Sequence, residues 1–158
     1  MLNMMLGEIA LWTHGTLRGS DALARGVGID TRKLSPGMLF AAIRGDRVDG
    51  HDFLRMAHTA GATGALVSRS VADIALPQVQ VADVQAALGD LASAVRARSN
   101  AIVIGITGSS GKTTVKNLCA SILGGVAATH ATEGNQNNEI GLPLSLLNMR
   151  DDAHFVVL

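Results

Sequence analysis

The sequence predicts an α/β fold in two units: a small N-terminal α/β unit over residues 1–82, and a second unit over residues 83–158 that begins a mostly parallel sheet. Two observations predict this fold. Apolar runs with the period of strands alternate along the chain with runs that have the period of helices. After residue 83 the pattern restarts with a long amphipathic run, a β-branched segment at 101–104 and a glycine-rich turn.

The first unit shows the alternation in short elements. Gly15 is placed to end an opening helix in a left-handed conformation, and Pro36-Gly37 predicts a turn. We expect, in order, a helix over 2–12, strands through 27–31 and 38–43, a helix around 53–57, and strands at 62–67 and 79–81.

The second unit has the pattern of a β-loop-α-β unit. Asp83 is placed to cap a helix that runs to about residue 98, and residues 101–106 predict the central strand of the parallel sheet. A helix with its apolar face toward the core is expected next, then strands at 126–131 and 154–158. The predicted apolar face comprises Val115, Leu118, Cys119, Ile122 and Leu123.

Composition excludes several classes of protein. The 158 residues carry 13 basic and 13 acidic side chains, and 47% are hydrophobic, which argues against a disordered chain and against a polybasic nucleic-acid-binding protein. Aromatic residues, at 3%, are too few for a base-stacking surface. The single cysteine, Cys119, excludes a disulfide framework and favours a reducing compartment, so we expect the cytoplasm. No apolar run approaches the roughly 20 residues of a bilayer-spanning helix, so no membrane insertion is expected.

The most specific motif is a glycine-rich loop between a strand and a helix, with the pattern of a phosphate-binding loop (P-loop). Its glycines allow backbone N–H groups to turn toward phosphate oxygens, Lys112 supplies a charge for the β- and γ-phosphates, and Thr113 is placed to hold Mg²⁺. The strict motif requires glycine where Ile106 stands, so the alternative of an ordinary glycine-rich turn stays open. The predicted ATP-binding residues are Thr107, Gly108, Ser109, Ser110, Gly111, Lys112, Thr113 and Thr114.

Three further segments are candidates for ligand contact. Asp30, Thr31 and Arg32 follow a predicted strand, where Arg32 can bind a diphosphate, although a surface ion pair or turn cap would use the same residues. A polar loop contains Gly45, Asp49, Gly50 and His51. Its glycines permit close approach of a ligand and His51 can hydrogen-bond a nucleoside, although the loop can also be an ordinary connection. The third segment contains three side-chain amides that can hydrogen-bond a sugar, a peptide or phosphate, or can cap a helix: Asn135, Asn137 and Asn138.

These motifs resemble one family. The loop at 107–114 is similar to the shortened P-loop of the Mur ligases, ATP-dependent amide-forming enzymes of bacterial peptidoglycan synthesis. The segments at 30–33, 36–40 and 49–53 resemble the family's uridine-nucleotide-binding domain. The segment at 134–147 resembles the branch that adds D-alanyl-D-alanine to UDP-N-acetylmuramoyl-tripeptide.

The resemblance implies that the first unit binds the UDP-linked substrate and that the P-loop binds ATP and Mg²⁺, with Lys112 as a catalytic residue. Family members continue into further active-site residues and a third domain. We therefore expect the chain to be the N-terminal part of a longer, monomeric enzyme and to form no amide bond by itself. Two alternatives stay open: the branch that adds a single amino acid, against which residues 135–147 argue, and a stand-alone nucleotide-binding module without catalysis.

Overall fold

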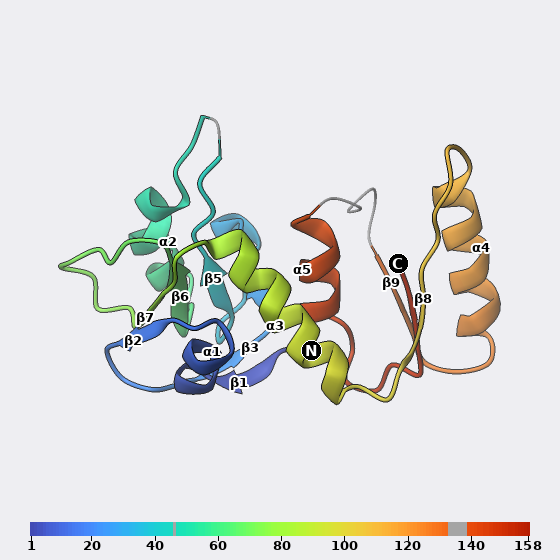
Figure 1. Ribbon diagram of the computed structural model, residues 1–158, viewed down its shortest axis with the longest axis horizontal. Coiled ribbons are helices and arrows are strands. Elements are labelled where there is room, and N and C mark those ends of the chain that lie inside the picture. The colour runs from blue at the N-terminus through green and yellow to red at the C-terminus, as the bar shows by residue number, and fades with distance from the viewer. Residues whose placement is uncertain (46, 133–138) are drawn as a thin grey trace.

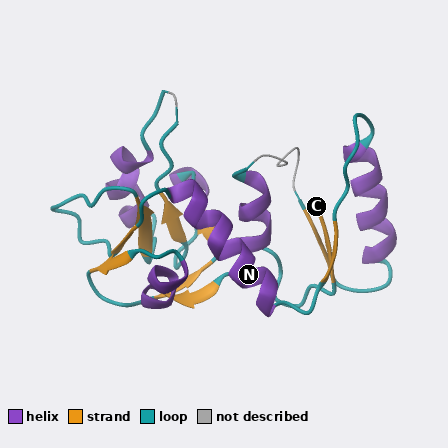
Figure 2. Cartoon of the chain, viewed as in Figure 1, coloured by secondary structure: helices purple, strands orange, loops and turns teal. Residues whose placement is uncertain are grey.

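The structure, a computed structural model, describes residues 1–45, 47–132 and 139–158. Within these ranges the strands form three separate sheets, with helices between and around them (Figures 1 and 2). The elements of the first part are β1 (Asn3–Met5), α1 (Leu6–Trp12), β2 (Thr16–Arg18), β3 (Leu23–Arg25), β4 (Val27–Gly28), η1 (Thr31–Lys33), β5 (Leu39–Ala41), η2 (Gly50–Phe53), α2 (Leu54–Thr59), β6 (Gly64–Val67) and β7 (Gln78–Gln80). Those of the second part are α3 (Val84–Arg98), β8 (Ile102–Ile104), α4 (Lys112–Gly124), β9 (Thr129–Ala131), α5 (Gly141–Leu147) and β10 (Phe155–Val157).

The first unit is built on a five-stranded sheet with the order β2-β7-β6-β5-β4. Strands β4, β5, β6 and β7 run parallel to one another, and β2 pairs antiparallel with β7 at the edge of the sheet. β5 and β6 are buried along their whole length, as the unbroken apolar runs predict. Since parallel strands end at the same edge, the segments after β4, β5 and β6 meet there, which is where open α/β sheets bind ligands.

The second unit holds a parallel three-stranded sheet with the order β8-β10-β9. Our prediction that residues 101–106 form the central strand is wrong for this sheet: β10 is central, and β8 lies at the edge. The residues of β10 explain its place, since Val156 and Val157 are fully buried whereas Ile102 of β8 is half exposed. No strand of this sheet pairs with a strand of the first unit, so no continuous sheet runs through both units.

Helices α3 and α5 pack against each other between the two sheets (Figure 1). Asp83 caps α3 by accepting from the Ala86 N–H at 2.9 Å, as predicted. One apolar core continues from the first unit through α3 to Leu147 and Val156. The boundary at residue 82 therefore stays a prediction, because α3 also packs against α1 of the first unit.

The chain opens differently from the prediction. Residues 3–5 form β1, antiparallel to β3, and the helix begins only at Leu6. The apolar residues at 2, 4 and 6 are buried, which is the period of a strand running into a helix. The left-handed residue after α1 is His14, with φ 51°, and not Gly15. Gly15 is instead required by a close approach, since a Cβ there would lie 2.7 Å from the Gln80 carbonyl oxygen.

Helix α4 also departs from the prediction. The expected apolar face is mostly exposed in this chain: Val115, Leu118 and Ile122 are all exposed, Cys119 is half-buried, and Lys116 is the buried residue of the helix. Helix α4 lies at one end of the structure (Figure 1), and these three apolar side chains are left exposed there. In the described part of the chain, no helix has the length and apolar character needed to cross a membrane.

Candidate functional sites at two sheet edges

The glycine-rich loop connects the carboxyl end of β8 to α4. Gly108 and Gly111 have φ values of 152° and 77°, in the region that disfavours side chains, so the loop requires glycine at both positions. Gly111 is the N-cap of α4, which directs the unpaired N–H groups of the first helical turn toward the loop. The arrangement of strand, loop and helix N-terminus is that of a phosphate site.

Lys112 lies across this loop. Its Nζ donates to the Gly108 carbonyl oxygen at 2.5 Å, so the ammonium is held over the loop. Thr113 is exposed in the first turn of α4, where its hydroxyl fits a single oxygen ligand of Mg²⁺. Among the described residues, no three His, Cys, Asp or Glu side chains cluster closely enough to hold a metal.

A buried lysine that the sequence analysis did not single out lies one turn further along α4. Lys116 donates from Nζ to the Thr132 carbonyl oxygen at 2.5 Å, at the end of β9. Ile106 donates its N–H to Leu158 O, and Thr132 donates its N–H to Val157 O, so the segments that follow all three strands of this sheet are joined at one edge. The loop is thereby attached to the same edge as the segment that follows β9.

In the first unit, a cavity of about 540 Å³ lies at the carboxyl edge of the sheet. Its apolar walls suit a flat base, and its polar rim consists of the predicted Asp30, Thr31 and Arg32. The apolar lining was not predicted, since its residues come from separate elements; it comprises Ile29, Phe40, Val48, Phe53 and Met56.

Asp30 and Arg32 form a local pair on this rim. Asp30 caps η1 by accepting from the Arg32 N–H at 3.0 Å, and its carboxylate accepts from the Arg32 guanidinium at 2.9 and 2.7 Å. The side-chain hydrogen bond from Arg32 is the largest cause that lowers the pKa of Asp30 to about 2. The Arg32 side chain is 86% exposed, so its outer N–H groups stay available to an anion. The ion pair and the ligand-binding role are therefore compatible.

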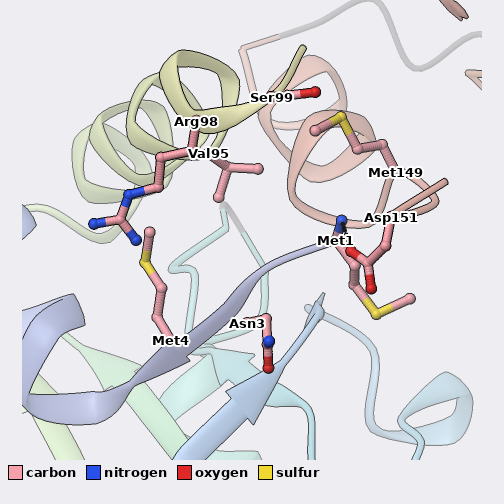
Figure 3. Close-up of a pocket in the computed structure, with 8 residues that line it drawn as sticks. All are labelled: Met1, Asn3, Met4, Val95, Arg98, Ser99, Met149 and Asp151. Carbon is pink, nitrogen blue, oxygen red and sulfur yellow. Dashed lines mark hydrogen bonds and ion pairs between the residues drawn. The ribbon is translucent and has the colours of Figure 1, made fainter. Parts of the chain in front are cut away.

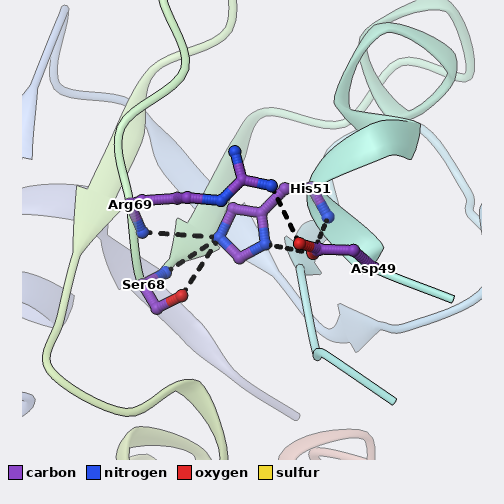
Figure 4. Close-up of polar contacts among 4 residues, drawn as sticks. All are labelled: Asp49, His51, Ser68 and Arg69. Atoms are coloured by element: carbon purple, nitrogen blue, oxygen red, sulfur yellow. Dashed lines mark hydrogen bonds and ion pairs between the residues drawn. The ribbon is translucent and has the colours of Figure 1, made fainter. Parts of the chain in front are cut away.

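The structure shows internal contacts for the predicted loop of Gly45, Asp49, Gly50 and His51, and ligand contact by Gly45, Asp49 and Gly50 stays a prediction. His51, expected to face a nucleoside, is buried inside a polar network with Asp49, Ser68 and Arg69 (Figure 4). A Cβ at Gly50 would lie 2.7 Å from both the N and O atoms of Ile43, so this glycine serves chain packing. Gly45 donates its N–H to Val48 O at 2.9 Å and closes the loop. Asn135, Asn137 and Asn138 lie outside the described residues.

A second cavity of about 430 Å³ lies between the two units. The first unit contributes Asp30 and Lys33 to its lining, and the second contributes His130, Ser145 and Asn148. Asp30 lines both this cavity and the apolar one, so the two are adjacent. A much smaller cavity, about 160 Å³, lies where the N-terminal strand meets the end of α3, with Met1, Met4 and Met149 in its wall (Figure 3).

Two known family patterns match the chain. The pattern described as "Mur ligase family, catalytic domain" matches residues 24–96, and that described as "Mur ligase middle domain" matches residues 106–158. The chain belongs to the Mur ligase family. Both edge sites of this Mur ligase chain fall within the matched segments.

Two sequence relatives carry the same enzyme name. The UDP-N-acetylmuramoyl-tripeptide–D-alanyl-D-alanine ligase of Escherichia coli strain K12 is 44% identical over 100% of the chain and 35% of its own length. The enzyme of the same name from Bacillus subtilis strain 168 is 39% identical, with 36% of its own length covered. A structure of MurF from Acinetobacter baumannii aligns with a TM-score of 0.88 and 33% identity, over 99% of this chain and 35% of that one.

A MurF ligase from Thermotoga maritima, solved in complex with ADP, aligns over 85% of this chain and 31% of its own, with 33% identity and a TM-score of 0.74. A diaminopimelate ligase aligns at 19% identity and a TM-score of 0.55, which shows a shared fold alone. The chain thus spans about a third of the length of the relatives it matches.

Proposed function

We propose that this chain supplies the uridine-nucleotide site and the ATP P-loop of an ATP-dependent amide ligase, which joins D-alanyl-D-alanine to UDP-N-acetylmuramoyl-tripeptide in peptidoglycan precursor synthesis. The observation that supports the proposal is an apolar cavity with a charged rim at the carboxyl edge of one sheet and a glycine-rich loop before a helix at that of another, in a chain that matches MurF ligases over both units. We place this enzyme in the cytoplasm as a monomer.

At the first edge, the apolar cavity takes the uracil base, and Arg32 binds the diphosphate. Asp30 orients Arg32 through two side-chain hydrogen bonds, which reduces the entropy lost when the guanidinium engages an anion. The cavity between the units holds the sugar and the peptide, which extend toward the P-loop. Lys33 lines this cavity and can pair with an acidic group. Asn135, Asn137 and Asn138 complete the contacts to sugar, peptide or phosphate.

At the second edge, the backbone N–H groups of residues 107–114 surround the phosphates of ATP, and Lys112 neutralises charge on the γ-phosphoryl group as it is transferred. Thr113 holds Mg²⁺, which supplies further charge neutralisation when bound. The peptide's terminal carboxylate attacks the γ-phosphorus and releases ADP, giving an acyl phosphate. The amine of D-alanyl-D-alanine then attacks the acyl carbon, phosphate leaves, and the amine loses a proton as the amide forms.

The test uses the full-length gene product that contains this sequence. With ATP, Mg²⁺, UDP-N-acetylmuramoyl-tripeptide and D-alanyl-D-alanine, we expect a product heavier by one dipeptide less water and one phosphate released per product. Formation of product from the UDP-dipeptide and a single amino acid, with none from D-alanyl-D-alanine, would place the enzyme in the amino-acid-adding branch. ATP binding without phosphate release in either mixture would favour a non-catalytic nucleotide module.

A further inference from the structure

We propose that His51 is a positioning residue for the apolar cavity: it fixes the loop and short helix that form two of the cavity walls, without contacting the ligand. The inference rests on the proposed uridine-nucleotide site and assigns a role within it. Val48 and Phe53, which flank His51 in the chain, both line the cavity.

The His51 ring is enclosed and has partners at both nitrogens. Its side chain is 1% exposed, so a ligand in the cavity does not reach it. Nδ1 lies 2.6 Å from Asp49 Oδ1, and Nε2 accepts from the Ser68 N–H at 3.1 Å and, more weakly, from the Arg69 N–H at 3.4 Å. Since a backbone N–H can only donate, Nε2 has to be the unprotonated nitrogen. The fold therefore selects the neutral ring with its proton on Nδ1, directed at Asp49.

These contacts join two segments at the carboxyl edge of the first sheet. Asp49 caps η2, accepting from the His51 N–H at 2.9 Å, and Ser68 and Arg69 directly follow β6. Arg69 closes the network by donating to Asp49 Oδ2 at 2.8 Å. The imidazole ring thus links the segment between β5 and α2 to the end of β6, and Figure 4 shows it lying between the two. Without the ring, the exposed Arg69–Asp49 contact and the Gly50 N–H bond to Ile43 O remain, but the segment between Val48 and Phe53 loses its buried link to the end of β6.

The order Asp49, His51, Ser68 also resembles the acid, base and nucleophile of a hydrolase, with Ser68 Oγ 3.3 Å from Nε2. The geometry argues against that role. The lone pair on Nε2 that would remove a proton from Ser68 already accepts a shorter hydrogen bond from the Ser68 backbone N–H. The hydroxyl therefore adds little to the link, and the backbone amides carry it.

Two substitutions separate the halves of the link. His51→Phe keeps the ring volume and removes both polar contacts, whereas His51→Gln keeps an acceptor near Nε2 and removes the donor to Asp49. With UDP as the probe, in calorimetry well below each variant's Tm, we expect about tenfold weaker binding for His51→Phe, because displaced walls misplace the base, and a smaller loss for His51→Gln. Ser68→Ala and the exposed His58→Phe of α2 are matched controls, expected within about twofold of wild type.

The ring itself gives a second readout that needs no substitution. Long-range ¹H–¹⁵N NMR of the wild-type chain is expected to show the His51 proton on Nδ1, whereas an exposed imidazole prefers the other tautomer. Unchanged UDP affinity in folded His51→Phe, or a proton on Nε2, would overturn the positioning role. If His51→Phe does not fold, His51→Gln and the tautomer decide. Absence of UDP binding by the wild-type chain would instead overturn the proposed nucleotide site, and a Ser68→Ala loss as large as that of His51→Phe would assign the link to the hydroxyl.

Discussion

Asn148 at the end of α5 offers a direct test of how the two units are held together. Its side-chain amide accepts from the Val27 N–H at 2.9 Å and donates to Val27 O at 2.8 Å and to Leu144 O at 2.9 Å. The amide therefore pairs with edge strand β4 as a neighbouring strand would, across 121 residues of sequence. Gly26 leaves room for it, since a Cβ there would lie 2.7 Å from Asn148 Oδ1.

Asn148→Ala removes all three hydrogen bonds and leaves the N–H and C=O of buried Val27 without these partners. An unpaired buried polar group costs about 1–3 kcal/mol, and water entering the truncated site recovers part of that cost, so we expect a loss of about 2–4 kcal/mol. For a chain of this size the loss corresponds to a fall of roughly 5–15 °C in Tm. Asn148→Asp keeps an acceptor for the Val27 N–H but directs a carboxylate at Val27 O, so it is expected to cost at least as much.

The assay is urea unfolding followed by circular dichroism, with exposed Asn117→Ala of α4 as the matched control, expected to change the unfolding free energy by less than about 0.5 kcal/mol. Because one apolar core runs through both units, the wild-type chain is expected to unfold in a single transition. A loss below about 0.5 kcal/mol for Asn148→Ala would refute the reasoning, since the amide would then not hold α5 to β4.

Three further outcomes are expected. In calorimetry with each ligand, Lys112→Ala should weaken Mg·ATP binding by about 1.5–3 kcal/mol and leave UDP binding unchanged, whereas Arg32→Ala should weaken UDP binding and leave Mg·ATP binding unchanged. Equal loss of UDP affinity in both variants would contradict the division of sites. Hydrogen bonds from the His51 backbone, Arg69 and the His51 ring hold the pKa of Asp49 below its ordinary value. Its contribution to stability is therefore complete above the unfolded pKa of about 4 and is lost as pH falls through the lower folded value. Asp49→Asn should therefore reduce the fall in unfolding free energy at acid pH, measured by urea unfolding. A fall in the variant as steep as that of the wild type would exclude this cause. Gly50→Ala should lower the free energy of unfolding by more than about 2 kcal/mol, because its Cβ meets backbone atoms. Gly45→Ala, whose Cβ would lie 3.5 Å from its nearest neighbour, should lower it by less than about 1 kcal/mol. Similar unfolding midpoints for the two variants would argue against the close approach at Gly50.

Features with local causes were predictable from the sequence. Asp83 stands directly before a helical period, and it caps α3 as expected. The loop at Gly108 and Gly111 lies between a β-branched run and a helix, and the structure places it there. In both cases the residues that determine the conformation are within a few positions of one another, so a single stretch of sequence carries the whole signal.

Features that depend on distant partners were not predictable in this way. Residues 3–5 form a strand because β3 pairs with them from 18 to 22 positions away, and periodicity alone favoured a helix. His51 stands in a polar, glycine-bearing loop, as ligand-binding histidines do, but its partners at 68 and 69 bury it. The order of β8, β10 and β9 depends on pairing between strands that lie far apart in the sequence, which no single segment records.

The central claim is that one chain carries a uridine-nucleotide site and a separate ATP site. NMR titration of the ¹⁵N-labelled chain with UDP and with Mg·ADP, singly and together, tests it most directly. We expect UDP to shift amide signals at 29–32, 48 and 53, Mg·ADP to shift those at 105–114, and each ligand to bind with the same affinity in the presence of the other. Competition between the two ligands, or UDP shifts centred on the P-loop, would contradict the account.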